Sequence, residues 1–142
     1  MAMAPGYAVQ EIEPGQCLQL RRDVLWPQLE LAQCRLQGDE QARHFGICVE
    51  GVVVSCLSLF EMGDGIYQLR KFATHAGFRN QGLGSALLAH AIAHVQAAGA
   101  RGMVLNARLS ALPFYRRHGF VRHGRAWRKS GVDFVEMRLQ AW

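Results

Sequence analysis

The segment Arg79–Ala86, which reads RNQGLGSA, constrains the fold of this chain more than any other feature. It follows a run rich in β-forming residues, Ile66–Thr74, and opens a stretch, Gly82–Ala98, whose apolar residues recur at helical spacing. A helix start leaves backbone N–H groups without intrahelical partners and carries a partial positive charge. Glycines at 82 and 84 let an anion approach those donors, and Arg79 adds a full charge. The segment therefore predicts a strand, a phosphate-binding loop and a helix in succession.

Two common nucleotide-binding motifs do not fit this loop. The sequence has no Walker A motif, and Leu87 stands where GxGxxG requires its third glycine. Binding of ATP or of a dinucleotide is thereby disfavoured. On the loop alone, an ordinary helix start with loop glycines explains these residues as well as cofactor binding does.

The remaining patterns predict one α/β domain over residues 1–142, with strands of mixed direction and helices on the faces of the sheet. Ser110 is expected to cap the helix that contains Pro113. The expected strands are 7–12, 44–50, 52–60, 66–74, 103–107, a strand from 120 onward and 134–139, and the expected helices are 14–25, 82–98 and 110–118.

Charge is distributed unevenly along the chain. Residues 65–132 contain no Asp or Glu but eleven Lys and Arg residues, within a net charge of +5. Such a segment attracts a polyanion, which leaves a phosphate-rich cofactor, a nucleic acid or no specific partner as alternatives. Apart from Trp127, aromatic residues are not interleaved with the basic ones as a nucleic-acid stacking surface requires. We therefore expect no nucleic-acid partner.

Several other classes of protein are disfavoured. His90 and His94 have helical spacing, but no HExxH motif or third ligand accompanies them, so no metal site is predicted. The apolar stretch 47–60 is too short to cross a bilayer, and residues 1–10 lack the features of a signal peptide. We expect a soluble, cytoplasmic protein with reduced thiols at its four cysteines, Cys17, Cys34, Cys48 and Cys56.

A second motif makes the loop more specific. About thirty residues after it, an aromatic–Tyr pair precedes Gly-Phe in the run Phe114–Phe120. The two motifs together resemble the GNAT superfamily of N-acetyltransferases, whose signature (Arg/Gln)-x-x-Gly-x-(Gly/Ala) is matched by Arg79, Gly82 and Gly84. The resemblance implies a single-domain GNAT-like fold with a mixed, mostly antiparallel sheet. It further implies that the central strands splay apart.

The resemblance also implies acetyl-CoA as the cofactor. The end of the strand at Phe72, Ala73 and Thr74 would pair with the pantetheine arm in the splayed gap. Backbone amides at the helix start would hold the pyrophosphate, namely those of Gln81, Gly82, Leu83, Gly84, Ser85 and Ala86. The implied activity is acetyl transfer to an amine of a small molecule or peptide, with family habit implying a homodimer.

Tyr115 is the candidate general acid, because its hydroxyl can donate a proton to the departing thiolate; the alternative is packing beside Phe114 and Phe120. The general base stays unassigned. Gln68 stands where some family members have a Glu, and an amide does not accept a proton at neutral pH. This departure leaves an acyl-CoA-binding sensor without turnover as the alternative function. Weaker candidates for the base are Glu61, Asp64, His75, Asp133 and Glu136.

Overall fold

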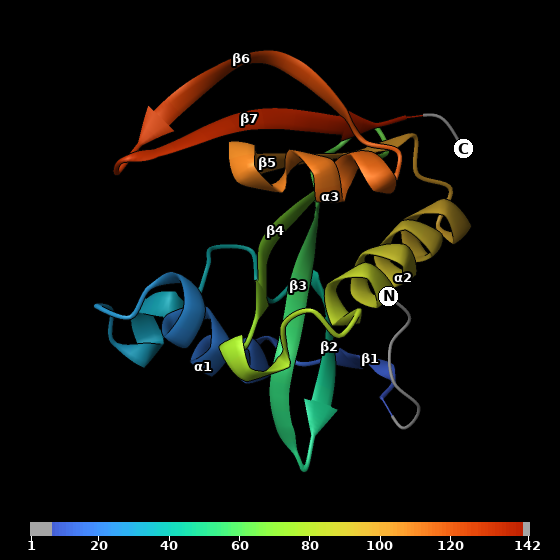
Figure 1. Ribbon diagram of the computed structural model, residues 1–142. Helices are drawn as coiled ribbons and strands as arrows, with labels where there is room; N and C mark the ends of the chain where they lie inside the picture. The colour runs from blue at the N-terminus through green and yellow to red at the C-terminus, as the bar shows by residue number, and fades with distance from the viewer. Residues whose placement is uncertain (1–6, 141–142) are drawn as a thin grey trace.

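The computed structural model describes residues 7–140. Within them one sheet has the strand order β1-β2-β3-β4-β5-β7-β6, and β4 with β5 is the only parallel pair (Figure 1). This arrangement confirms the predicted α/β fold with a mixed, mostly antiparallel sheet. The strands are β1 (Val9–Ile12), β2 (Arg43–Val49), β3 (Val52–Glu61), β4 (Ile66–Thr74), β5 (Gly102–Arg108), β6 (Val121–Lys129) and β7 (Val132–Leu139).

The helices lie close to their predicted positions. The helical segment from Pro14 to Leu25 combines a 3₁₀ turn, the short α1 (Leu18–Leu20) and a π turn. The longest helix, α2 (Leu83–Ala97), buries an apolar stripe, and α3 (Leu112–Arg117) is shorter. No helix within residues 7–140 is long and apolar enough to cross a membrane. Further 3₁₀ turns lie at Leu31–Cys34, Ala76–Phe78 and Leu109–Ala111.

One sequence prediction about the helices is wrong. Ser110 was expected to cap α3, but it lies inside the 3₁₀ turn that precedes this helix. The N-cap position belongs to Ala111, and no side chain caps the helix there. The extra turn moves the start of α3 to Leu112, which frees the Ser110 side chain from a capping role.

The two faces of the sheet carry different packing. Side chains alternate along β3, so Leu57 and Leu59 belong to the large core together with α2, whereas Cys56 packs with Leu20 of α1 on the other face. The α2 and α3 helices lie side by side (Figure 1), and His118, at the end of α3, hydrogen-bonds Ser85 of α2. The sheet thus separates the α2–α3 side from the α1 side.

The α1 side is fixed by a buried polar network. Arg21 is fully buried and donates to both carboxylate oxygens of Asp39 at 2.8 and 3.0 Å. It also donates to Ser58 Oγ at 3.0 Å. His44 Nε2 faces the carbonyl of Asp39 and must donate to it, so in the neutral ring Nδ1 accepts from Ser58. This network ties the helical segment to β2 and β3.

The only parallel pair forms a short seam in the sheet. Strands β4 and β5 are paired at Ile66–Gln68 and Gly102–Val104, and the pairing ends there toward the carboxyl ends of both strands. The rest of β4, from Leu69 to Thr74, is paired with β3 alone. This separation confirms the predicted splay between the central strands.

Candidate functional site

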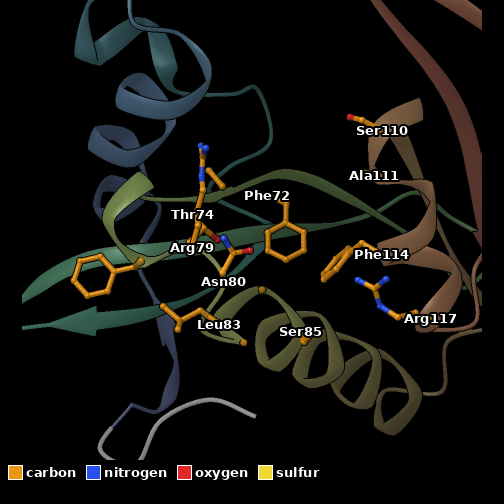
Figure 2. Close-up of a pocket in the computed structure, with 14 residues that line it drawn as sticks. Phe72, Thr74, Arg79, Asn80, Leu83, Ser85, Ser110, Ala111, Phe114 and Arg117 are labelled. Carbon is orange, nitrogen blue, oxygen red and sulfur yellow. The ribbon is translucent and has the colours of Figure 1, made fainter. Parts of the chain in front are cut away.

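One cavity of the structure, which we call the main cleft, has a volume of about 770 Å³. It opens where the end of β4, the following loop, the start of α2 and the start of α3 converge (Figure 2). The structure therefore brings all the residues of the predicted cofactor site together except Gln81 and Ala86, which do not line the cleft. The lining residues are Phe72, Ala73, Thr74, Phe78, Arg79, Asn80, Gly82, Leu83, Gly84, Ser85, Ser110, Ala111, Phe114 and Arg117.

The loop presents the start of α2 to this cleft. Gly82 is the N-cap, with φ 80° and ψ 6°, and no side chain satisfies the helix start there. The first hydrogen bond of the helix runs from Ala86 N–H to Gly82 carbonyl at 3.1 Å. The N–H groups of Leu83, Gly84 and Ser85 precede it and therefore have no intrahelical partner. They form a set of donors suited to an anion.

Two aromatic rings form the opposite wall. Phe72 of β4 and Phe114 of α3 point toward one another (Figure 2), with ring centroids 6.0 Å apart in an edge-to-face arrangement. A Cβ built on Gly84 would lie 3.6 Å from the Phe72 ring and 3.7 Å from the Phe114 ring. A side chain at Gly84 would thus be in van der Waals contact with this apolar wall.

The charge of the main cleft is positive. Arg79 and Arg117 line it, and its lining contains no carboxylate. Arg117 lies over the Phe114 ring, with its guanidinium carbon 5.9 Å from the centroid. Burial, together with the charge of Arg117, lowers the pKa of His118, so this imidazole adds no charge at neutral pH. Loop donors, two arginines and an apolar wall together suit an extended, phosphate-bearing ligand.

A smaller cavity of about 150 Å³, which we call the seam cavity, opens where β4 and β5 separate. Phe72 lines both cavities, so they are neighbours. The residues that line the seam cavity are Leu25, Leu69, Arg70, Lys71, Phe72, Leu105, Asn106, Arg108 and Tyr115.

Tyr115, the predicted acid, lines the seam cavity rather than the main cleft. Burial raises its pKa to about 12, so the phenol stays protonated throughout the neutral range. Its ring also packs against Phe114 and Phe120, with centroids 5.2 and 5.9 Å away. Within residues 7–140 its hydroxyl makes no hydrogen bond and is therefore available as a donor. Tyr115 therefore has the features of both alternatives, a proton donor and a packing residue.

None of the candidate bases lines either cavity. Gln68 lies in the paired part of β4, and Glu61 and Asp64 are exposed near the far end of that strand. The side chain of His75 accepts a hydrogen bond from Gly77 N–H and is exposed. Asp133 and Glu136 are held in ion pairs by Arg128 and Arg138.

The two helical histidines contact a core ring. His90 and His94 lie edge-on to Phe45, with centroids 4.8 and 5.0 Å away. Within residues 7–140 no group of three His, Cys, Asp or Glu side chains could hold a metal ion.

Sequence reasoning missed several of the residues that line the cavities. Asn80, Ser110 and Arg117 line the main cleft beside the predicted residues. Lys71 and Arg108 line the seam cavity. The absence of Asp and Glu from residues 65–132 was the available signal for these cations. That pattern does not indicate which of the basic residues line a cavity.

Comparisons with known proteins agree with this geometry. The profile of the acetyltransferase (GNAT) domain matches residues 21–141. The uncharacterized N-acetyltransferase YitI of Bacillus subtilis (strain 168) is 27% identical over 134 residues, which cover 89% of this chain and 85% of YitI.

Solved structures share the fold. The ribosomal-protein-S18-alanine N-acetyltransferase of Escherichia coli superposes with a TM-score of 0.79 at 18% identity, covering 94% of this chain and 93% of that one. A GNAT family acetyltransferase of Elizabethkingia anophelis, solved with acetyl-CoA bound, gives a TM-score of 0.76 at 15% identity. That match covers 97% of this chain and 100% of the other.

Proposed function

Because this chain belongs to the GNAT acetyltransferase family, we propose that it transfers an acetyl group from acetyl-CoA to an amine of a small molecule or peptide. The observation that carries the proposal is the main cleft. Unpartnered N–H groups at the start of α2 and two arginines line this cleft, and no carboxylate does. A phosphate-rich thioester is the kind of substrate that such a surface attracts.

The residues of the main cleft fit coenzyme A. The amides of Leu83, Gly84 and Ser85 would hold the pyrophosphate, because they are donors at the positive end of α2. Gly84 leaves room for that approach, since its bare backbone adds no side chain between the start of α2 and the rings of Phe72 and Phe114. The end of β4, at Phe72–Thr74, pairs with β3 but not with β5, so its free edge offers backbone groups to the amides of the pantetheine arm.

Acetyl-CoA supplies an activated acetyl thioester: the C–N bond forms as the C–S bond breaks, the amine loses a proton and the sulfur gains one. In this proposal Tyr115 donates the proton to the sulfur. Its pKa of about 12 keeps it protonated, and its hydroxyl has no competing partner within the described part of the chain. Proton donation of this kind contributes most as charge develops on the leaving group.

A second candidate function is an acyl-CoA sensor without turnover. The observation that favours it is that no carboxylate and no histidine lines either cavity, so no side chain of the usual kind would take the amine proton. The two functions share the main cleft and differ only in turnover. Location in the cytoplasm and assembly into a homodimer stay predictions under either of them.

Two measurements test the proposed function. The melting temperature is measured with CoA, ATP and NAD at equal concentrations, and CoA alone should raise it strongly. At a hundredfold excess over Kd, binding stabilises the folded state by about 2.7 kcal/mol. Thiol release from acetyl-CoA is then measured against a panel of amines, amino acids, polyamines and peptide N-termini. No shift with millimolar CoA would refute the cofactor assignment. A CoA shift without thiol release across the whole panel would favour the sensor.

A further inference from the structure

The seam cavity is lined by positive charge from both strands that border it. Arg70 and Lys71 come from β4 and Arg108 from β5. The lining contains no Asp or Glu, and its other polar groups are the amide of Asn106 and the hydroxyl of Tyr115. Three cationic residues that line a cavity of about 150 Å³ favour an anion there.

Among the described residues none of these cations has a carboxylate partner. Within residues 7–140 the ion pairs of arginine involve Arg21, Arg35, Arg43, Arg128 and Arg138, and no ion pair includes a lysine. Arg70 instead lies over the Phe60 ring, 5.3 Å from its centroid. Lys71 Nζ lies 4.0 Å from the centroid of the Trp26 ring.

The backbone at Lys71 is distorted in a way that aims this side chain. The register between β3 and β4 shifts, so that Lys71 and Phe72 stand opposite Leu57 alone, as in a β-bulge. Lys71 has φ 54°, a left-handed conformation that a residue other than glycine adopts only under strain. The contact with Trp26 shows that its side chain extends toward the helical segment 14–25, whereas Phe72 extends into the main cleft. The bulge therefore places Lys71 at the seam cavity, next to Phe72 in the wall that the two cavities share.

The lowered pKa of Lys71 is consistent with neighbouring positive charges that no carboxylate neutralises. Burial, followed by the charges of Arg70, Arg21 and Lys129, lowers its pKa to about 8. A nearby carboxylate would have acted in the opposite direction.

We propose that the seam cavity binds a carboxylate of the acceptor, so that the acceptor is an amine of the amino-acid type, held by Lys71, Arg70 and Arg108. This inference rests on the proposed acetyl transfer, because the cavity adjoins the main cleft through Phe72 and contains Tyr115. The same cations disfavour a protonated amine beside them, so the amine enters its reactive neutral form without a carboxylate base.

The test compares matched acceptors that differ only in charge. Thiol release from acetyl-CoA is measured with amino acids and with their C-terminal amides, using the parent, Lys71→Gln and Arg108→Gln. We expect each variant to lower kcat/KM for the best amino acid at least tenfold and to change that for its amide less than threefold. Comparing each variant with the parent cancels the different amine pKa values of acid and amide. CoA affinity, measured by thermal shift, should stay within twofold.

A matched control separates the cavity from general charge. Arg101→Gln removes the same charge at the opposite end of β5, where the residue is exposed and lines neither cavity. This variant should change kcat/KM for the amino acid and for its amide less than twofold. Charge reversal in Lys71→Glu should shift the preference toward diamines.

Several results would overturn the inference. One is an equal loss of kcat/KM for the amino acid and its amide in Lys71→Gln. Another is a parent protein that prefers diamines as acceptors. A third is a parent protein that prefers an amine bearing a phosphate instead of a carboxylate. If no amine supports thiol release, acetyl transfer itself fails, and amino acids and amides are then titrated into the CoA-loaded protein. Thermal stabilisation by amino acids that is lost in Lys71→Gln would still support a carboxylate subsite. Its absence from the parent would refute one.

Discussion

The same methyl group added at two glycines of the loop should have opposite effects. Gly82 has φ 80°, whereas Gly84 lies two residues later within α2 and does not have a positive φ. A left-handed conformation costs a residue with a Cβ about 1–2 kcal/mol. In a compatible helical position, Gly→Ala stabilises by about 0.4–1 kcal/mol through the unfolded state. The Cβ at Gly84 would meet its nearest atom at 3.6 Å, which is ordinary contact.

These energies translate into melting temperatures. For 142 residues, an unfolding entropy of about 2.1 cal/mol/K per residue sums to about 0.3 kcal/mol/K. Gly84→Ala should therefore raise Tm by about 1–3 °C. Gly82→Ala should lower it by about 3 °C, because the strain exceeds the entropic gain by about 1 kcal/mol. Circular dichroism during heating, without ligand, measures both values.

Cofactor binding should separate the same pair. Gly84→Ala should bind CoA within a few-fold of the parent, since the GNAT signature accepts Gly or Ala there. Gly82→Ala should bind about tenfold more weakly, the equivalent of ~1.4 kcal/mol, because relieving the strain turns the donors of α2 away from the cleft. Gly84→Glu should lose CoA binding while staying folded, because its carboxylate would stand where the phosphate approaches. Equal stability and equal binding in the two Ala variants would refute this account of the loop, and unchanged CoA binding by Gly84→Glu would refute the position of the pyrophosphate.

Three further changes have defined outcomes. Tyr115→Phe keeps the ring and removes only the hydroxyl, so it should lower kcat about a hundredfold with little change in CoA affinity; a kcat within twofold of the parent would leave Tyr115 as a packing residue. Arg117→Ala should weaken CoA roughly tenfold but 3′-dephospho-CoA much less, as isothermal titration can measure, and an equal loss for both would exclude contact with the 3′-phosphate. Asp39→Asn leaves Arg21 buried without its counter-charge and should reduce the free energy of unfolding by about 3–5 kcal/mol in urea at pH 7. Burial alone would raise the pKa of Asp39, but hydrogen bonds from Arg21 and Leu36 N–H lower it below its ordinary value. The advantage of the parent over Asp39→Asn should therefore be complete above about pH 4 and disappear as the pH falls through the folded-state pKa. An advantage that does not change with acidification would show that the carboxylate charge contributes nothing.

The strands and α2 could be predicted from sequence because local patterns specify them. Alternation and β-branched residues mark β3 and β4, and the spacing of Leu83, Leu87, Ala91 and Val95 marks the buried face of α2. The main cleft follows from the same local information, since the loop lies between two well-marked elements.

The seam cavity and the buried network could not be predicted in this way. Nothing in the local sequence around Lys71 signals a left-handed residue, because the position carries neither glycine nor asparagine. Arg21 and Asp39 are 18 residues apart, and isolated charges belong by default on the surface. Their pairing depends on how the helical segment packs on β3, which is a tertiary contact.

The short seam between β4 and β5 also bears on how the protein folds. Residues 9–74 contain one antiparallel half of the sheet and residues 102–139 the other, and the chain passes between them once, through α2. Within residues 7–140 the β4–β5 ladder joins the halves only from Ile66↔Gly102 to Gln68↔Val104, next to one backbone hydrogen bond from Arg101 N–H to the Gly65 carbonyl. Each half has its own antiparallel ladders and can form separately, so docking of the two halves is a distinct step that closes the loop between Ile66 and Gly102. Because both cavities border this junction, we expect the site to assemble in that docking step and to be lost first when the halves part.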